Sequence, residues 1–167
     1  MAVQTSVSDN FAAAIPGMVR GSPAGMKTRV AQVAMQGGLL VVQGTRDEQC
    51  KLPTASTDVT NVLKPLGITR DNVARDPNFP SGGTAGYTYQ IGDSVEIVSQ
   101  GQVWVTVEEA VAPGDDVYVR YDTGGASQKG AFRSSADSST AALLAGAVYR
   151  TTAAADGLAL VEINLPQ

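Results

Sequence analysis

The chain has 167 residues and a formal net charge of −4, with 12 basic and 16 acidic side chains, one cysteine and no histidine. The absent histidine and the single Cys50 exclude disulfide scaffolds, Cys/His zinc sites and mechanisms that need an imidazole base. The negative charge, without runs of lysine or arginine, argues against binding to nucleic acid. No apolar stretch reaches the roughly 18 residues of a membrane-spanning helix. We therefore expect neither nucleic acid nor a membrane as a partner.

The balance of residue types favours an all-β fold. Charged residues make up 17% of the chain, and glutamate and lysine are too few to cover several amphipathic helices. Glycines separate short runs rich in valine and threonine, which is typical of strands joined by tight turns. The length is that of one domain, which we assign to residues 26–167, preceded by an extended N-terminal arm over residues 1–25.

The arm has turn residues at short intervals, and Pro16 ends its only fragment of helical character. Two interpretations of its apolar side chains remain open: they anchor the arm on a neighbouring molecule, or they cover the core of the chain itself. These side chains are Val3, Phe11, Ile15, Met18 and Val19.

Residues 27–43 predict two neighbouring strands, with Gly37 and Gly38 as the turn of a hairpin between them. Residues 45–90 form a long irregular insertion, in which residues 58–64 could make a short helix with Asp58 as its N-cap. Its later part, residues 67–86, is long for a loop in a compact domain, and such loops are usually functional. Phe79 in this loop is therefore a further candidate for contact with another chain.

The clearest strand pattern covers residues 94–165, where turn signals recur about every 8–15 residues, as in an antiparallel sandwich or barrel. Trp104 lies in one of these strands between two valines. We expect its side chain to fill the core rather than to form a stacking surface.

A turn and a strand follow near the middle of this region. Pro113 presets φ and Gly114 accepts a positive φ, so the two fit a type II turn that Asp115 caps. Val117 and Tyr118 belong to the strand that begins after it.

Few residues could carry chemistry. Lys51 could lower the pKa of Cys50, but a thiol without an imidazole partner is a weak signal for catalysis. Glu108 and Glu109 are adjacent, so on a strand they would point to opposite faces and could not share a substrate.

A group of three aspartates has two interpretations. Asp115, Asp116 and Asp122 could approach one another and form an oxygen-rich pocket for Ca²⁺, or they could be a turn cap and two solvated side chains. We favour the second interpretation and predict no catalytic residue, no cofactor and no metal.

Four stretches of the chain carry a resemblance to a known family. They are residues 1–5 with 14–19, residues 101–105, residues 109–119 with the glycines near 124–132, and residues 145–148 with 158–163. In these stretches the chain resembles the structural cement, or capsid decoration, proteins of tailed bacteriophages.

The resemblance implies a jelly-roll-like or barrel-like antiparallel β domain on the outer capsid surface of the virion, synthesised in the bacterial host cytoplasm. Such proteins form homodimers or homotrimers at capsid symmetry axes and bridge neighbouring major capsid proteins, and they carry no catalytic residues. The alternative is a carbohydrate- or receptor-binding β-sandwich module on the virion, with Tyr87, Tyr89, Trp104 or Tyr121 exposed for stacking.

Overall fold

A computed structural model describes residues 14–71, 87–123 and 128–166, and its regular structure is almost entirely β-strand, which confirms the all-β prediction. No helix in these ranges is long and apolar enough to cross a bilayer. The elements in chain order are β1 (Val19–Ala31), β2 (Met35–Gln36), β3 (Leu40–Gln43), β4 (Gln49–Lys51), α1 (Ser56–Thr60), β5 (Pro65–Thr69), β6 (Thr88–Tyr89), β7 (Ser94–Thr106), β8 (Asp116–Arg120), β9 (Phe132–Arg133), β10 (Ala141–Tyr149) and β11 (Leu158–Asn164).

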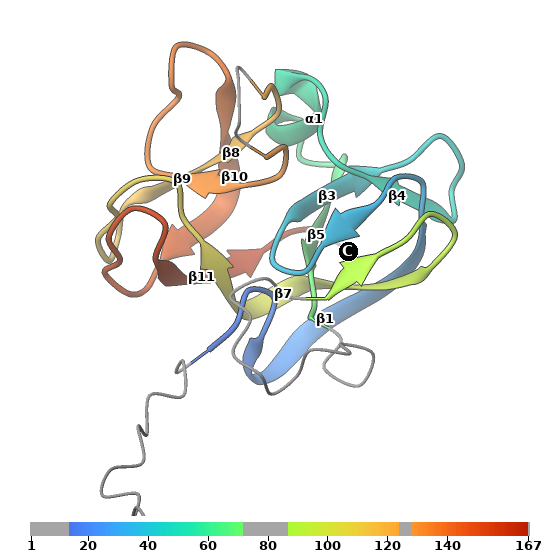
Figure 1. The fold of residues 1–167 in the computed structure, drawn as a ribbon, viewed down its shortest axis with the longest axis horizontal. Helices are drawn as coiled ribbons and strands as arrows, with labels where there is room; N and C mark the ends of the chain where they lie inside the picture. The colour runs from blue at the N-terminus through green and yellow to red at the C-terminus, as the bar shows by residue number, and fades with distance from the viewer. Residues whose placement is uncertain (1–13, 72–86, 124–127, 167) are drawn as a thin grey trace, which may run out of the picture.

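The long strand β7 organises the molecule. In the described residues, nine strands form one sheet in the order β1-β4-β3-β5-β7-β11-β10-β8-β9. Because β1 also pairs with β7, the first five strands close into a barrel-like ring. Strands β11, β10, β8 and β9 extend from the other end of β7, so that β3–β5 and β8–β10 lie on opposite sides of it (Figure 1).

Two buried clusters form the core, and β7 contributes to both. Val103 and Val105 of β7 belong to the larger cluster, which joins β7 and strands β8–β11 and also includes Leu40 of β3, Val59 of α1 and Ile68 of β5. Val95 and Ile97, near the start of β7, belong to the smaller cluster inside the ring. The smaller cluster consists of Ala31, Met35, Val41, Cys50, Leu66, Tyr89, Val95 and Ile97.

The N-terminal region is more integrated in the sheet than an arm over residues 1–25 implies. Strand β1 begins at Val19 and pairs with β7 from the Val19–Val103 pair onward, so the expected boundary at residue 25 falls inside a strand. The expected hairpin at Gly37 and Gly38 is wrong, because β2 pairs with β6 and not with β3. Turn residues in the sequence show where the chain bends, but they do not show which strand the following segment pairs with.

The insertion expected over residues 45–90 contains regular elements in its described part. Strand β5 is buried along its whole length between β3 and β7. Helix α1 begins at Ser56 with Ala55 as N-cap, so the expected cap at Asp58 is wrong. Asp58 instead accepts a hydrogen bond from the Thr54 backbone N–H at 3.0 Å and pairs with Lys64 at 2.9 Å. Burial alone would raise the pKa of Asp58, but these partners outweigh it and lower the pKa to about 2.

The thiol of Cys50 is predicted to report the opening of the ring. Cys50 in β4 is fully buried, and this burial raises its pKa to about 11. We expect a disulfide reagent such as DTNB to react with the native protein at least about 1,000-fold more slowly than with the protein in denaturant. Rapid labelling of the native protein would show that β4 does not seal this part of the core.

Candidate functional site

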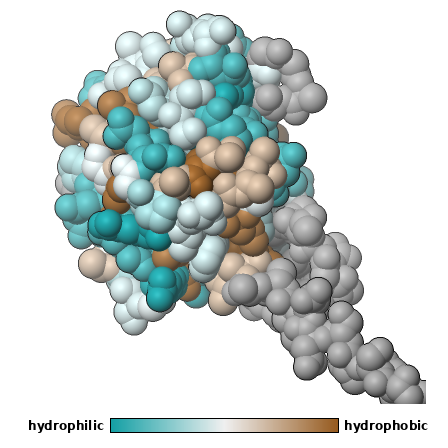
Figure 2. All heavy atoms as spheres, turned by 90° about the vertical axis from the view of Figure 1, so that its left-hand side faces the viewer, coloured by the Kyte–Doolittle hydropathy of each residue, from teal (hydrophilic) through white to brown (hydrophobic). Residues whose placement is uncertain are grey.

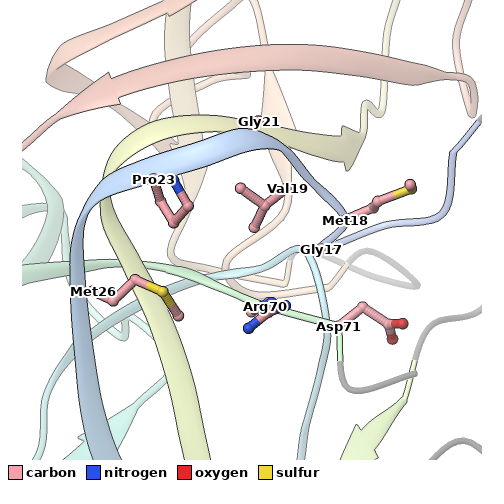
Figure 3. Close-up of a pocket in the computed structure, with 8 residues that line it drawn as sticks. All are labelled: Gly17, Met18, Val19, Gly21, Pro23, Met26, Arg70 and Asp71. Atoms are coloured by element: carbon pink, nitrogen blue, oxygen red, sulfur yellow. The ribbon is translucent and has the colours of Figure 1, made fainter. Parts of the chain in front are cut away.

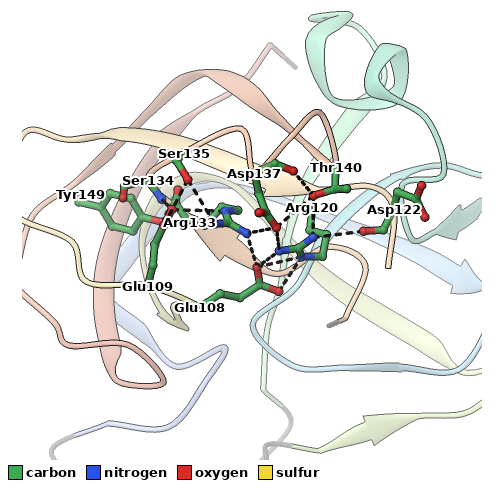
Figure 4. A network of polar contacts seen from close by, with 10 residues as sticks. All are labelled: Glu108, Glu109, Arg120, Asp122, Arg133, Ser134, Ser135, Asp137, Thr140 and Tyr149. Carbon is green, nitrogen blue, oxygen red and sulfur yellow. Dashed lines mark hydrogen bonds and ion pairs between the residues drawn. The ribbon is translucent and has the colours of Figure 1, made fainter. Parts of the chain in front are cut away.

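A cluster of charged residues lies where β8, β9 and the end of β7 meet (Figure 4). Arg120 at the end of β8 is 4% exposed and donates from Nε to both carboxylate oxygens of Glu108, at 2.8 Å each. Its Nη2 donates to Asp137 at 2.7 Å, and its Nη1 donates to the Thr140 hydroxyl at 2.8 Å. This guanidinium therefore connects β8 with Glu108, which follows β7, and with the turn that contains Asp137 and Thr140.

A second arginine completes the cluster. Arg133 in β9 pairs with Asp137 at 2.7 Å, with Glu108 at 3.2 Å and with Glu109 at 3.1 Å. The expectation that Glu108 and Glu109 point to opposite faces is wrong, because β7 ends at Thr106 and the chain bends after it. Both carboxylates therefore reach the same arginine.

The cluster holds a turn in an unfavourable backbone conformation. Asp137, Ser138 and Ser139 have φ values of 44°, 53° and 68°, and a left-handed conformation costs a non-glycine residue about 1–2 kcal/mol. The hydrogen bond from Arg120 is the largest cause that lowers the pKa of Asp137. A lowered pKa means that this stabilisation is present above the ordinary aspartate pKa and is lost as the pH falls through the lowered value. The contacts of Asp137 with the two arginines thus hold this surface turn in one conformation.

The three aspartates proposed as a Ca²⁺ alternative have other positions. Asp115 Oδ2 accepts a hydrogen bond from the Ala112 backbone N–H at 2.8 Å, within the turn, and Asp116 is exposed at the start of β8. Asp122 contributes its backbone carbonyl to Arg120. Among the residues that the structure describes, no three metal-ligating side chains gather at one point.

A pocket of about 290 Å³ lies under a bend in β1 (Figure 3). Arg20 pairs with Gln102 and Gly25 with Gln100, so residues 21–24 of β1 stand opposite Gly101 alone and arch away from β7. We call residues 21–24 the arch. The pocket is lined by Gly17, Met18, Val19, Gly21, Pro23, Met26, Arg70 and Asp71.

The pocket is apolar on the β1 side and polar on the β5 side. Met18 and Met26 are 45% and 44% exposed, which is high for methionine, and Val19 and Met26 point inward from β1 toward Arg70 (Figure 3). Arg70 pairs with Glu96 of β7 at 2.8 Å. On the molecular face drawn in Figure 2, hydrophobic residues form several small groups among polar residues. Exposed apolar side chains beside a hollow are a usual feature of a contact surface.

The structure brings together some of the candidate contact residues. Met18 and Val19 both line the pocket. Ile15 is half-buried and lies in the chain shortly before Gly17, the first residue of the lining. Val3, Phe11 and Phe79 lie outside the described residues. The segments that carry them join the described chain at residues 14, 71 and 87, and Asp71 lines the pocket and accepts a hydrogen bond from the Tyr87 N–H at 2.7 Å.

The candidate turn residues form a turn. Gly114 has a φ of +92°, and the Asp115 N–H donates to the Ala112 carbonyl at 3.2 Å across Pro113. Val117 is buried in the larger cluster, and Tyr118, the next residue of β8, is half-buried on the other face.

Trp104 differs from the expectation of a core side chain. Val103 and Val105 are fully buried in the larger cluster, whereas Trp104 is half-buried and belongs to neither cluster. The reason is strand alternation, because side chains on either side of a buried valine point to the opposite face. The backbone of Trp104 accepts a hydrogen bond from the Gly17 N–H at 2.7 Å and donates one to the Met18 carbonyl at 2.9 Å, so it anchors the segment that lines the pocket.

The aromatic residues named for a stacking surface do not form an exposed platform. Tyr89 is fully buried, and Tyr87, Trp104 and Tyr121 are half-buried. Tyr87 and Tyr89 pack edge to face at 5.0 Å. The Tyr121 hydroxyl donates to the Ser139 carbonyl.

Sequence patterns gave no indication of two further groups of residues. Arg120 and Arg133 read as single charges on strands, and only the sheet order brings them to the same carboxylates. Met26 and Arg70 are distant in sequence and meet at the pocket because β1 and β5 both pair with β7. Pro23, between two glycines, was the only local signal of the arch.

Comparison with known proteins gives the following matches. A family model described as "Structural cement protein (E217 gp24/Pam3 gp6)" matches residues 3–164. A solved chain from "The capsid of Myoviridae Phage XM1" has a TM-score of 0.69 and 20% sequence identity, with 98% of each chain covered. A chain from "The crystal structure of head fiber gp8.5 N base in bacteriophage phi29" has a TM-score of 0.41 and 15% identity, with 85% of this chain and 97% of that chain covered. No curated protein sequence matches the chain. The first of these solved chains therefore shares the fold described above.

Proposed function

Because the chain belongs to the phage structural cement protein family, we propose that it binds the outer face of a phage capsid and bridges neighbouring major capsid proteins. Its membership gives it a structural role in the virion. The match over residues 3–164, nearly the whole chain, is the observation that carries this proposal. We further propose that the chain acts as a homodimer or homotrimer on a capsid symmetry axis, after synthesis in the host cytoplasm.

The physical role that we propose is adhesion across a joint. A shell under the pressure of its packaged genome fails where subunits separate, and a bridging protein adds buried surface across that joint. An interface of about 1,600 Å² is a usual size for a specific contact, and several such contacts act together when the bridging protein is an oligomer. The pocket with its exposed Met18 and Met26 supports this role, because it offers apolar surface beside the joining points of two further segments.

Binding to empty shells tests the proposal directly. Purified protein is mixed with expanded and unexpanded empty shells, and the bound copies are counted by cryo-electron microscopy. We expect saturable binding to expanded shells at symmetry-related positions, and light scattering on the free protein distinguishes dimer from trimer. Failure to bind shells of either form would overturn the proposal.

A deletion tests the contribution of the N-terminal arm. Residues 19–25 pair with β7, so a deletion that includes them would damage the sheet, whereas residues 2–13 lie outside the described fold. We expect the 2–13 deletion to weaken shell binding and to leave the circular dichroism unchanged. Unchanged binding would show that Val3 and Phe11 are not contact residues.

A further inference from the structure

Strand β1 has an edge that pairs with no other strand over most of its length. One edge of β1 pairs with β7 from Val19 to Val30, but the other edge pairs with β4 only at Val30 and Ala31. In the described part of the chain, residues 19–29 therefore present an unpaired edge. Such an edge is a template for an additional strand from another chain.

The hydrogen bonds of the neighbouring strands show which backbone groups this edge offers. Thr28 pairs with Glu96, whose carbonyl is already used by the Arg70 N–H at 2.8 Å, so the backbone of Thr28 faces away from β7. The Val30 N–H, two residues later, points the same way and donates to the Glu48 carbonyl at 2.8 Å. By alternation the Met26 N–H and carbonyl also face outward. The Thr28 carbonyl accepts a hydrogen bond from Arg29 Nη1 at 2.9 Å, so within residues 26–29 the groups left for a partner strand are the N–H groups of Met26 and Thr28 and the Met26 carbonyl.

The charge along this edge is entirely positive. Arg20, Lys27 and Arg29 lie on β1, and the sequence has no acidic residue between positions 10 and 46, although the whole chain carries a net charge of −4. Lys27 and Arg29 share one face of the strand, and burial together with the positive charge of Arg29 lowers the pKa of Lys27. The buried Nε of Arg29 has no hydrogen-bond partner among the described residues. Lys27 Nζ donates to the Pro166 carbonyl at 3.2 Å and Arg29 Nη1 donates to the Thr28 carbonyl, but neither cation pairs with a carboxylate of the residues that the structure describes. A carboxylate beside these two side chains would relieve their repulsion.

The opposite face of the same strand carries Met26 and Thr28 and borders the pocket, which is apolar on its β1 side. Met26 points into the pocket under the arch, and Met18 and Pro23 line the same hollow. A strand added to the edge would therefore have cations on one face and an apolar pocket on the other. Because side chains alternate along a strand, this arrangement selects a period of two in the partner.

We propose that the outer edge of β1 binds an extended segment of a capsid subunit in which acidic and apolar side chains alternate, through main-chain hydrogen bonds to residues 26–29. This inference rests on the proposed function and names the mode of contact. A second copy of the chain fits less well, because a symmetric pair of β1 edges would bring the same cations against each other. The other role for such charges is to block any pairing at the edge, and the experiment below separates the two roles.

Two variants of the full chain test the proposal in a shell-sedimentation assay. Thr28→Pro removes an outward N–H and no bond to β7, a change that edge strands tolerate, and Thr28→Ala is its control. Lys27→Glu reverses one charge of the edge, and Lys129→Glu reverses one charge outside it. We expect Thr28→Pro and Lys27→Glu each to weaken shell binding by about tenfold, with the controls binding as wild type, and we expect added salt to weaken wild-type binding more than that of Lys27→Glu.

Each remaining outcome is decisive. If wild type binds and Thr28→Pro binds equally well, no strand is added at this edge, and the proposal is overturned whatever the effect of Lys27→Glu. If only Lys27→Glu binds as wild type, the acidic character of the partner segment is overturned. If wild type binds no shell, the proposed function fails, and the inference fails with it. Should Thr28→Pro not fold, hydrogen exchange on the wild type replaces it: the amides of Met26 and Thr28 are expected to exchange at least about tenfold more slowly on the shell, and unchanged exchange overturns the proposal.

Discussion

Replacement of Arg120 with methionine is expected to lower the free energy of unfolding by about 2–3 kcal/mol. Methionine has a similar length, so little packing is lost, but the Glu108 and Asp137 carboxylates lose the buried guanidinium that faces both. Hydrogen bonding to Glu108 is the largest cause that raises the pKa of Arg120, so the folded protein favours the charged form of this side chain. Urea unfolding followed by circular dichroism measures the loss.

Arg150 provides the matched control for this substitution. It also pairs with a glutamate, Glu162, at 3.0 Å, but the two side chains are 47% and 38% exposed. An exposed pair is screened by water and contributes little, so Arg150→Met should cost far less stability than Arg120→Met. Equal losses for the two variants would mean that the Arg120 cluster does not act as a buried ion network.

The turn next to Arg120 gives a second measurement on the same variant. Asp137, Ser138 and Ser139 keep their positive φ values while Arg120 and Arg133 hold the Asp137 carboxylate. Without Arg120 the turn should relax, and its amides should exchange faster than they do in the wild-type protein. The amides of β11, which lies outside the cluster, should exchange at the wild-type rate. Unchanged exchange in the turn would show that Arg133 alone maintains it.

The strand-rich character of the region from β7 to β11 was accessible from the sequence because its signals are local, although the turn signal at Gln100 and Gly101 lies inside the unbroken strand β7. Alternating valines and the Pro113 and Gly114 turn need no knowledge of the partner strand to be recognised. The same reasoning placed Trp104 on a strand but on the wrong side of it, since a half-buried tryptophan and a core tryptophan share the same flanking residues. That Trp104 lies on a strand was thus predictable, whereas the side of the strand that it occupies was not.

The ring and the pocket depend on contacts that no local pattern encodes. Strand β5 contains a proline and a glycine, which usually argue against a central strand, and it is buried only because β3 and β7 lie on both sides. The arch of β1 has the composition of a loop, yet the residues on both sides of it pair with β7. The sequence identified Met18 and Val19 only as isolated apolar side chains that could contact a neighbouring molecule. They line one pocket together with Arg70 because the ring closes, which is a property of the whole sheet.

Gly67 in β5 is expected to be the least replaceable position of the ring. Its φ is +145°, and a Cβ atom there would lie 2.1 Å from the Val98 carbonyl oxygen of β7. The obstacle is backbone of the shared strand, so it cannot move aside as a flexible side chain could. Gly67→Ala should therefore lower the free energy of unfolding by at least about 3 kcal/mol, from backbone strain and from separation of β5 and β7.

Gly114 separates these two causes. It also has a positive φ, +92°, but no atom lies within 4 Å of the position that its Cβ would take. Gly114→Ala should therefore cost only the conformational part, about 1 kcal/mol. Urea unfolding of the two variants, with Cys50 labelling as a second readout inside the ring, compares the costs. If both variants lose the same free energy, close contact between β5 and β7 does not hold the ring together, and faster Cys50 labelling in Gly67→Ala alone would show that the ring opens at this contact.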